Sequence, residues 1–358
     1  MLLSIAYNVD MSFRMGLSIF TVVFLAVIIF VSRNEIAHAW ELLAKVNIWV
    51  LLLLIPGQML VYYAGGEMIF SYLRSKSSIE DVKRGELTRI SLELNFVNHI
   101  LPSGGVSGLS YVNWRLGQYG VSAGRATMAQ AVRYSAGFAA FVALLLVAVI
   151  AVTIDGQINR WIILISSSLV GLMFSIVAAT VFLLSSKRRI DRFAGWAHRT
   201  INGVVRKVTF GRRPQLIGQE VIATFFDELH HDFLALSHDK RLLVKPFLWG
   251  LVFMAGDAAL FLVTFLALGT MVNPAIILIA YGVASIAGFF VVTPGGAGAY
   301  EAIMVSFLAI AGVTSGVAIA GIVLTRVILL LGTIIFGYLF YQHALIKYGK
   351  RHKPTTNR

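Results

Sequence analysis

Long apolar runs alternate with short basic segments along the chain. Most of these runs approach or exceed the ~20 residues of α-helix that cross a hydrocarbon core about 30 Å thick. The pattern predicts an all-α polytopic membrane protein with about eight transmembrane elements plus one re-entrant hairpin, in two related halves. The predicted elements are Met15–Val31, Val46–Tyr63, Met128–Val152, Trp161–Leu184, Phe247–Leu268, Ala275–Val292, Glu301–Ala311 and Ala318–Tyr341.

Two breaks rich in proline and glycine interrupt the apolar runs. The first lies in Asn98–Leu109 and the second in Phe289–Ala302. Backbone leaves a helix at membrane depth only where protein or a water-filled cavity satisfies its N–H and C=O groups. Paired breaks in corresponding halves are typical of substrate sites in transporters. We therefore predict that the substrate binds at these breaks.

Charge decides the topology of Leu92–Trp114. If this segment crossed the bilayer, Ser185–Lys245, with its twelve Lys and Arg residues, would face outward against the positive-inside rule. If it enters and leaves on one side, the flanking basic residues, including Arg115, Arg125 and Arg133, all stay cytoplasmic, and each limb is a helix of roughly 15 Å. We therefore predict a re-entrant hairpin over 92–114 with its Pro-Ser-Gly-Gly tip near mid-membrane. The alternative is an amphipathic segment lying flat at the interface.

The same charges divide the chain into four parts. Residues 1–184 form an N-terminal membrane half, 185–245 a basic cytoplasmic segment, 246–346 a C-terminal membrane half with a break at 293–298, and 347–358 a basic cytoplasmic tail. We expect a multi-pass protein of the cell membrane with both termini in the cytoplasm. The first apolar run is either a retained helix or a signal peptide. We favour the helix because the run is long for a signal peptide and more spans follow.

The cytoplasmic segment carries two amphipathic stretches. Apolar residues recur at helical spacing from Ile190 to Val208 and again in Leu216–Leu236, a pattern typical of helices that lie on anionic lipid. Polar residues in and just after the second stretch form either a metal site or a solvated face. We favour the solvated face, because the spacing shows no open coordination set. These residues are Asp227, His230, His231, Asp232 and His238.

Composition agrees with the membrane assignment. The chain is 58% hydrophobic and 13% charged, whereas soluble domains are about 25% charged. Its formal charge of +13 is clustered between apolar runs, where it sets topology and attracts anionic lipid, so we expect no nucleic-acid partner. The absence of cysteine excludes disulfides, thiolate metal sites and cysteine nucleophiles.

Three features together resemble a known family. They are the Leu-Pro-Ser-Gly-Gly break after Asn98 and His99, the Thr-Pro-Gly-Gly-Ala-Gly break before Tyr-Glu-Ala, and an arginine in the final span. Over Met11–Gln342 the chain resembles the flippase-like transmembrane family that includes the membrane region of lysylphosphatidylglycerol synthases. The resemblance implies two related halves that bind or move a charged phospholipid or another lipid-linked phosphate. It covers the translocating part without a soluble aminoacyl-transferase domain, and Ser107-Gly108-Leu109 departs from the acidic residue and following arginine of many members.

The depth of two charged residues adds to the candidate site. Arg326 lies eight residues inside Ala318, about 12 Å from the outer end of its span, and Asp257 lies twelve residues beyond Lys245, about 18 Å from the inner end. The two therefore lie near one level, where a lone arginine is costly. We expect Arg326 to contact the headgroup phosphate, with Asp257 or Glu301 as its partner in the empty state; the alternative is an inert structural ion pair.

The second break adds a helix end to this site. The run after Glu301 is too short to span unless its helix begins nearer Gly296, which would direct a helix N-terminus into the protein. The candidate substrate-binding residues are Asn98, His99, Pro102, Ser103, Gly104, Gly105, Asp257, Pro294, Gly295, Gly296, Gly298, Glu301 and Arg326.

Three functions remain open at this point. The first is a flippase or transporter for an anionic phospholipid or lipid-linked phosphate, which would need no cofactor and no metal. The second is a membrane enzyme acting on a lipid phosphate, with His99, Glu93 and Glu301 as acid and base. The third is an accessory subunit for a separate lipid-modifying or glycosyl-transfer enzyme. We favour the first, and expect no enzymatic activity, because the sequence contains no P-loop and no His-Glu-x-x-His motif.

Overall fold

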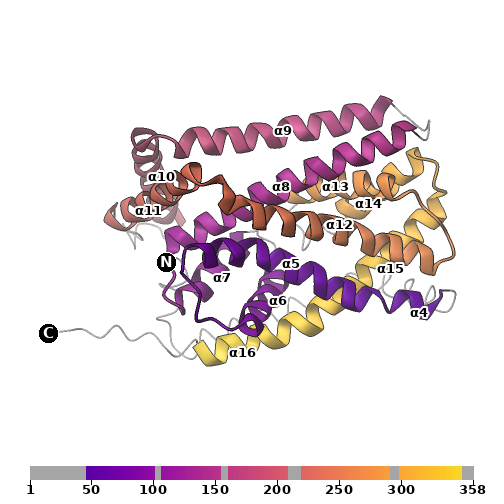
Figure 1. Cartoon of the computed structure of the whole chain (residues 1–358), viewed down its shortest axis with the longest axis horizontal. Helices are drawn as coiled ribbons and strands as arrows, with labels where there is room; N and C mark the ends of the chain where they lie inside the picture. Colours follow the sequence, from indigo (N-terminus) through magenta and orange to yellow (C-terminus); the bar gives the residue numbers. More distant parts are fainter. Residues whose placement is uncertain (1–45, 101–105, 155–159, 209–218, 291–297, 349–358) are drawn as a thin grey trace.

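The computed structural model describes residues 46–100, 106–154, 160–208, 219–290 and 298–348, and within these ranges the secondary structure is helical (Figure 1). Four helical stretches in this part of the chain are long and apolar enough to cross a membrane. They are Ile48–Ser75, Ala123–Ala151, Lys240–Ala267 and Ser315–Tyr348. The prediction of an all-α protein with several membrane-crossing helices is therefore confirmed.

The predicted count of eight elements is not confirmed. Met15–Val31 lies outside the described residues, and Trp161–Leu184 is the helix α9 (Arg160–Leu184). The predicted elements Ala275–Val292 and Glu301–Ala311 correspond to shorter apolar helices. The helix Ala299–Ile310, with 12 residues, is about 18 Å long and cannot span a core of about 30 Å.

The N-terminal half contains an antiparallel helix pair between two long helices. The pair is α6 and α7: the side chain of Asn98 packs against Gly108 near the break, and Glu93 bonds to Arg115 farther from it. The start of α6 and the end of α7 therefore lie on the same side of the molecule, where α5 ends and α8 begins. The placement of this pair in a bilayer as a re-entrant hairpin stays a prediction. The helices are α4 (Ile48–Leu51), α5 (Leu54–Ser75), α6 (Arg84–Ile100), α7 (Val106–Gly117) and α8 (Ala123–Ile154).

The C-terminal half repeats this order. Its short pair, α13 and α14, has the same lengths as α6 and α7, 17 and 12 residues. Helix α13 begins with a proline, whose missing N–H costs nothing there, and the Asn273 side chain accepts a 2.9 Å hydrogen bond from the Ala275 N–H. The helices are α12 (Val244–Ala267), α13 (Pro274–Phe290), α14 (Ala299–Ile310), α15 (Ser315–Gly332), the π-helical turn η3 (Thr333–Gly337) and α16 (Tyr338–Tyr348).

The two halves run in opposite directions. The Asn47 N–H, just before α4, donates a 2.8 Å hydrogen bond to the carbonyl of Ala267 at the end of α12, so α5 and α12 are antiparallel. The first short pair follows the end of α5 and the second follows the end of α12, so the pairs enter from opposite ends of the molecule (Figure 1). Inverted repeats of this kind are a common transporter architecture.

Small residues bring the long helices of the two halves close together. A side chain at Gly57 on α5 would meet Leu260 of α12, and one at Gly256 on α12 would lie 2.9 Å from Val61 of α5. Close helix approach over small residues is the usual basis of association in a membrane, where lipid is as apolar as the helix surface. The α5–α12 contact therefore forms the centre around which the two short pairs are placed.

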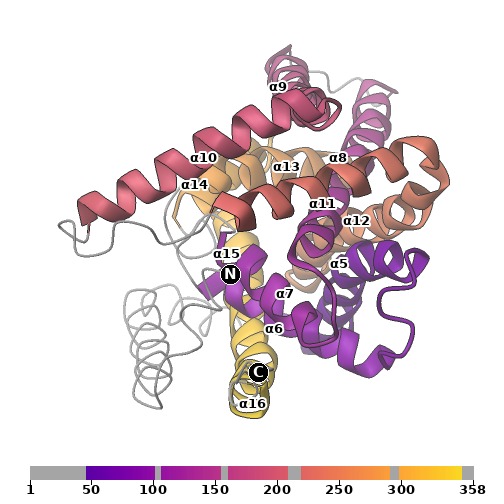
Figure 2. The same ribbon diagram turned by 90° about the vertical axis from the view of Figure 1, so that its left-hand side faces the viewer.

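Two helices in the connection between the halves lie at one end of the bundle. They are α10 (Lys187–Val208) and α11 (Gln219–His238). Seen from that end, α10 extends across the ends of the long helices instead of along them (Figure 2). Phe193 of α10 packs edge-on against Phe226 of α11, while Trp196 stays 54% exposed. The described parts of both stretches are therefore helical, as their spacing predicted, whereas their contact with anionic lipid stays a prediction.

Candidate functional site

The second break leads into α14 through a glycine. Gly298 has φ +88°, a conformation that L side chains rarely adopt, and α14 begins at the next residue. The Glu301 side chain reaches back one turn and accepts a 2.7 Å hydrogen bond from the Gly298 N–H. Helix α14 therefore starts with a carboxylate at its positive end, which stabilises the helix dipole. The predicted start of this helix near Gly296 is close to the observed one.

The same carboxylate binds the arginine of the final span. Arg326 Nε donates to the second oxygen of Glu301 over 2.7 Å, and the guanidinium lies 4.5 Å from the centre of the Tyr300 ring. The side chains of Arg326 and Glu301 are 23% and 22% exposed. Glu301 is thus the partner of Arg326, and the pair remains partly accessible.

Asp257 takes a different partner at a similar depth. It accepts a 2.6 Å hydrogen bond from the Tyr281 hydroxyl, which joins α12 to α13. Phe261, one turn further along α12, lies between Tyr281 and Tyr300, with ring centroids at 6.5 and 6.4 Å. Both acidic residues predicted around Arg326 thus belong to one layer of polar and aromatic side chains, at the level where α14 begins.

The first break shows a different chemistry. The Asn98 side chain fills the space beside Gly108, where any added Cβ would overlap it. The neighbouring His99 donates from Nδ1 to the Asn95 carbonyl over 2.8 Å. Asn98 thus packs against the other limb, whereas the His99 bond stays within α6. The atoms nearest to a Cβ at Gly108, the third residue of α7, belong to Asn98 and not to a carboxylate. At the third residue of α14 stands Glu301.

A buried ionic cluster joins α6 and α7 in the part of the first pair that lies far from the break. Arg115, which is 1% exposed, donates to Glu93 over 3.0 Å and to Glu86 over 3.4 Å, and Tyr111 donates to Glu93 over 2.9 Å. Burial, followed by a hydrogen bond with the neighbouring Tyr348, raises the pKa of the Tyr119 hydroxyl to about 12. Because Glu93 already binds Arg115 and Tyr111, its carboxylate is occupied by structural partners.

The sequence alone did not predict this cluster, because Arg115 was interpreted as one of the cytoplasmic charges that flank the hairpin. A signal was present: in a hairpin whose tip is Pro102–Gly105, Glu93 and Arg115 lie at similar distances from the tip and therefore face each other.

Seven of the predicted site residues lie outside the described residues and are not placed by the structure. They are Pro102, Ser103, Gly104, Gly105, Pro294, Gly295 and Gly296.

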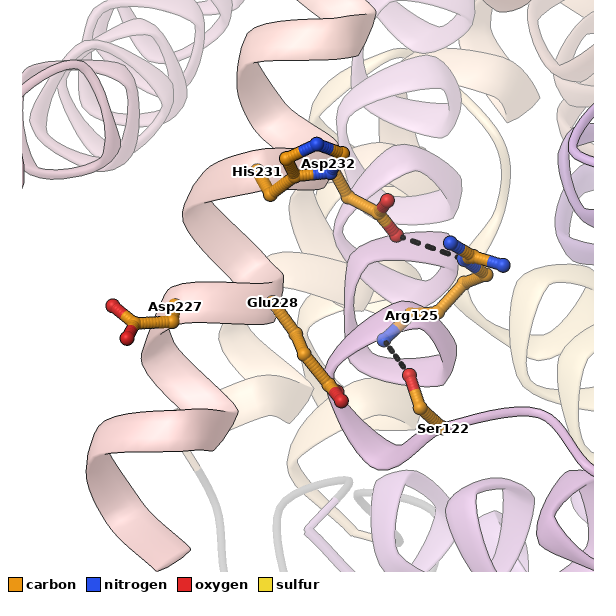
Figure 3. Close-up of a pocket in the computed structure, with 6 residues that line it drawn as sticks. All are labelled: Ser122, Arg125, Asp227, Glu228, His231 and Asp232. Atoms are coloured by element: carbon orange, nitrogen blue, oxygen red, sulfur yellow. Dashed lines mark hydrogen bonds and ion pairs between the residues drawn. The ribbon is translucent and has the colours of Figure 1, made fainter. Parts of the chain in front are cut away.

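Three of the polar residues considered as a metal site contact neighbouring helices instead. Figure 3 shows Asp232 directed toward Arg125 at the start of α8, over 3.4 Å, while Asp227 points away from it. Asp227 pairs with Lys187, and His230 donates to the Leu184 carbonyl over 2.7 Å. Within the described ranges, no three His, Asp or Glu side chains come together as metal ligands would. The group attaches α11 to the neighbouring helices.

Comparison with known proteins gives one assignment. A family model described as "Lysylphosphatidylglycerol synthase TM region" matches residues 15–337, nearly the whole chain. The comparison with curated proteins found no match. The family match covers both breaks, both short helix pairs and Arg326.

Proposed function

The chain belongs to the lysylphosphatidylglycerol synthase TM region family, and from this premise we propose that it is a flippase-type transporter. It binds a charged phospholipid or another lipid-linked phosphate and moves it between the two leaflets of the cell membrane. It does so without catalysing a chemical reaction and without a cofactor.

The observation that carries this proposal is the partly accessible Arg326–Glu301 pair at the start of α14. Arg326 is the twelfth residue of α15, about 16 Å from the beginning of that helix. An arginine at such depth costs at least about 2.5–3.5 kcal/mol unless it has a partner, so charged residues there usually serve substrate or ion pathways. Glu301 supplies the partner in the empty state. Two oxygens of a phosphate can accept hydrogen bonds side by side from the planar guanidinium, so a phosphate can replace the carboxylate.

The structure also bears on the enzymatic alternative. An acid–base role for Glu93 would require a free carboxylate, yet Glu93 is 2% exposed and bound by Arg115 and Tyr111. Glu301 is bound by Arg326 and by the Gly298 N–H. These contacts favour carboxylates that pair with arginines over carboxylates that transfer protons.

The test is lipid movement by purified protein in liposomes. A fluorescently labelled anionic phospholipid is placed in both leaflets, and a membrane-impermeant reductant reports how fast the inner label reaches the outside. Arg326→Lys keeps the charge but loses the planar fork, so we expect it to insert normally and to lose at least tenfold in rate. The matched control is Arg125→Lys, which alters an arginine paired with Asp232 at the end of the bundle and should keep the wild-type rate.

Three results would argue against the proposal. Chemical alteration of the lipid would indicate an enzyme, and no movement or alteration by the wild type would indicate an accessory subunit. Full activity of Arg326→Lys would show that the pair is structural. The same conclusion follows if Arg326→Ala fails to fold and Glu301→Ala/Arg326→Ala restores an active protein.

A further inference from the structure

Arg133 is a cation inside the bundle that the proposed function does not use. It lies on α8, and its guanidinium reaches α5: a Cβ built on Gly65 would lie 3.6 Å from Arg133 Nη2 and 3.1 Å from the Phe253 ring of α12. Its other terminal nitrogen, Nη1, is buried and has no hydrogen-bond partner in the part of the chain that the structure describes. The salt bridges found among those residues do not include Arg133.

The depth of Arg133 places it beside the break of the first pair. Asn113 on α7 donates to Thr127 on α8 over 2.9 Å, so these two residues are level. Arg133 lies six residues beyond Thr127, about 9 Å further along α8, and the first residue of α7, Val106, lies seven residues from Asn113, about 10 Å in the same direction. His99 lies within electrostatic range of both Arg133 and Arg326. Arginines from both halves therefore interact electrostatically with His99, in the last turn of α6.

The inverted repeat gives Arg133 a counterpart. Arg133 follows Val106, the first residue of α7, by 27 positions, and Arg326 follows Ala299, the first residue of α14, by 27 positions. In the second half the arginine is bound by Glu301, the third residue of α14. The third residue of α7 is Gly108, whose place for a side chain is filled by Asn98. The first half thus repeats the arginine but not the carboxylate that neutralises it.

An arginine that has no carboxylate partner among the described residues needs an external anion or water at this depth. We propose that Arg133 binds the phosphate oxyanion of an anionic phospholipid, in a second site that is open in the empty protein because the repeat omits the acidic residue there. This inference rests on the proposed function and deepens it. The Arg326 site is closed by its own glutamate until substrate displaces it, whereas the Arg133 site is ready to bind. The positive end of α7 lies at the same level and favours the same charge.

The test measures ligand-induced stabilisation of the full chain. Protein in phosphatidylcholine nanodiscs is compared with protein in nanodiscs containing phosphatidylglycerol, whose headgroup carries a net negative charge, and the Tm is followed by intrinsic fluorescence. A ligand that binds only the folded protein raises Tm. We expect Arg133→Gln to lose most of the rise caused by phosphatidylglycerol, and to have an unliganded Tm equal to or above that of the wild type, because it removes an unneutralised charge. The matched control Arg125→Gln, on the same helix, should keep the rise.

The opposite pattern would overturn the inference. If Arg133→Gln lowers the unliganded Tm and keeps the full rise, Arg133 has a structural role only. If this variant fails to insert, Arg133→Lys decides: loss of most of the rise supports phosphate binding through the guanidinium fork, and an unchanged rise contradicts it.

Inorganic phosphate added to phosphatidylcholine nanodiscs separates the two sources of the oxyanion. An Arg133-dependent rise with phosphate alone shows that the site recognises the free ion as well, and a rise with phosphatidylglycerol only shows that it needs the lipid. A wild type that is stabilised through Arg133 but moves no lipid would refute the proposed function and leave this inference standing.

Discussion

The replacement Glu301→Gln distinguishes a substrate site from a structural ion pair, because the two interpretations predict different changes in the affinity for anionic lipid and in stability. Gln retains one side-chain oxygen that accepts the Gly298 N–H, so the start of α14 is preserved, but it removes the negative charge from Arg326. If Glu301 competes with substrate phosphate for Arg326, the variant binds anionic lipid more tightly than the wild type. If the pair only holds α14 to α15, the variant is less stable and gains no affinity.

The expected size of the effect follows from the contact that substrate must break. The Arg326–Glu301 hydrogen bond is 2.7 Å long and joins two charged side chains that are about one-quarter exposed. Hydrogen bonds to charged groups contribute about 1.5–3 kcal/mol. With about 1.4 kcal/mol for each factor of ten, removing this competition lowers the Kd for anionic lipid by about 10-fold to 150-fold. We expect slower lipid movement at the same time, because the variant lacks the carboxylate that displaces the bound phosphate from Arg326.

The Kd is measured by titrating labelled anionic phospholipid into protein in phosphatidylcholine nanodiscs, and movement by the liposome assay. Glu67→Gln is the matched control, because Glu67 also pairs with an arginine, Arg74, but on a single helix outside the candidate site. An unchanged or higher Kd for Glu301→Gln, with normal insertion, would refute the competition between Glu301 and phosphate.

Two further predictions concern the placement of the chain in the membrane. With both termini and the central segment in the cytoplasm, a single cysteine introduced at Lys83 or Lys207 of this cysteine-free chain should resist an impermeant thiol reagent applied to intact cells and react after permeabilisation; labelling from outside would contradict the topology. A peptide of α10, Lys187–Val208, carries basic residues that each contribute about 1 kcal/mol at an anionic surface. Its Trp196 fluorescence should shift with anionic vesicles at low salt and return in ~1 M salt, where the Debye length is about 3 Å; equal binding to neutral vesicles would exclude the electrostatic contribution.

The sequence predicted the long helices well, because twenty apolar residues have few alternatives to a buried or membrane-crossing helix. It predicted the existence of both breaks from Pro102 and Pro294 with their following glycines. It did not show that Ala275–Val292 and Glu301–Ala311 pair with each other, because the first of these runs has the length and hydropathy of an ordinary span. The packing of α13 against α14 in the structure shows that the chain turns back there. Hydrogen bonds of Tyr281 with Asp257 and of Arg326 with Glu301 tie this pair to α12 and α15.

The candidate site was predictable in part. Depth counted along the helices placed Arg326 and Asp257 near one level, and this agrees with the layer that the structure shows. Depth gives no direction around a helix, so the sequence left both Asp257 and Glu301 as possible partners of Arg326, and the structure shows its hydrogen bond with Glu301. Arg133 was interpreted as a flanking charge because the start of α8 at Ala123, ten residues earlier, is not marked by hydropathy.

The difference between the two halves leads to a last prediction. The fifteenth residue of α6 is Asn98, whereas the fifteenth residue of α13 is Gly288; the third residue of α7 is Gly108, whereas the third residue of α14 is Glu301.

The double replacement Asn98→Gly/Gly108→Glu therefore converts the first pair into a copy of the second. Removing the Asn98 side chain makes room for the new glutamate, which the repeat places at the level of Arg133. We expect the variant to be at least as stable as the wild type without anionic lipid, since it neutralises Arg133, and to lose most of the phosphatidylglycerol-dependent rise in Tm, since the new carboxylate occupies the guanidinium. Asn98→Gly alone is the control and should keep that rise. If the double variant is stable and still gains the full rise, the charge of Arg133 is not what attracts the lipid, and the asymmetry between the halves has another cause.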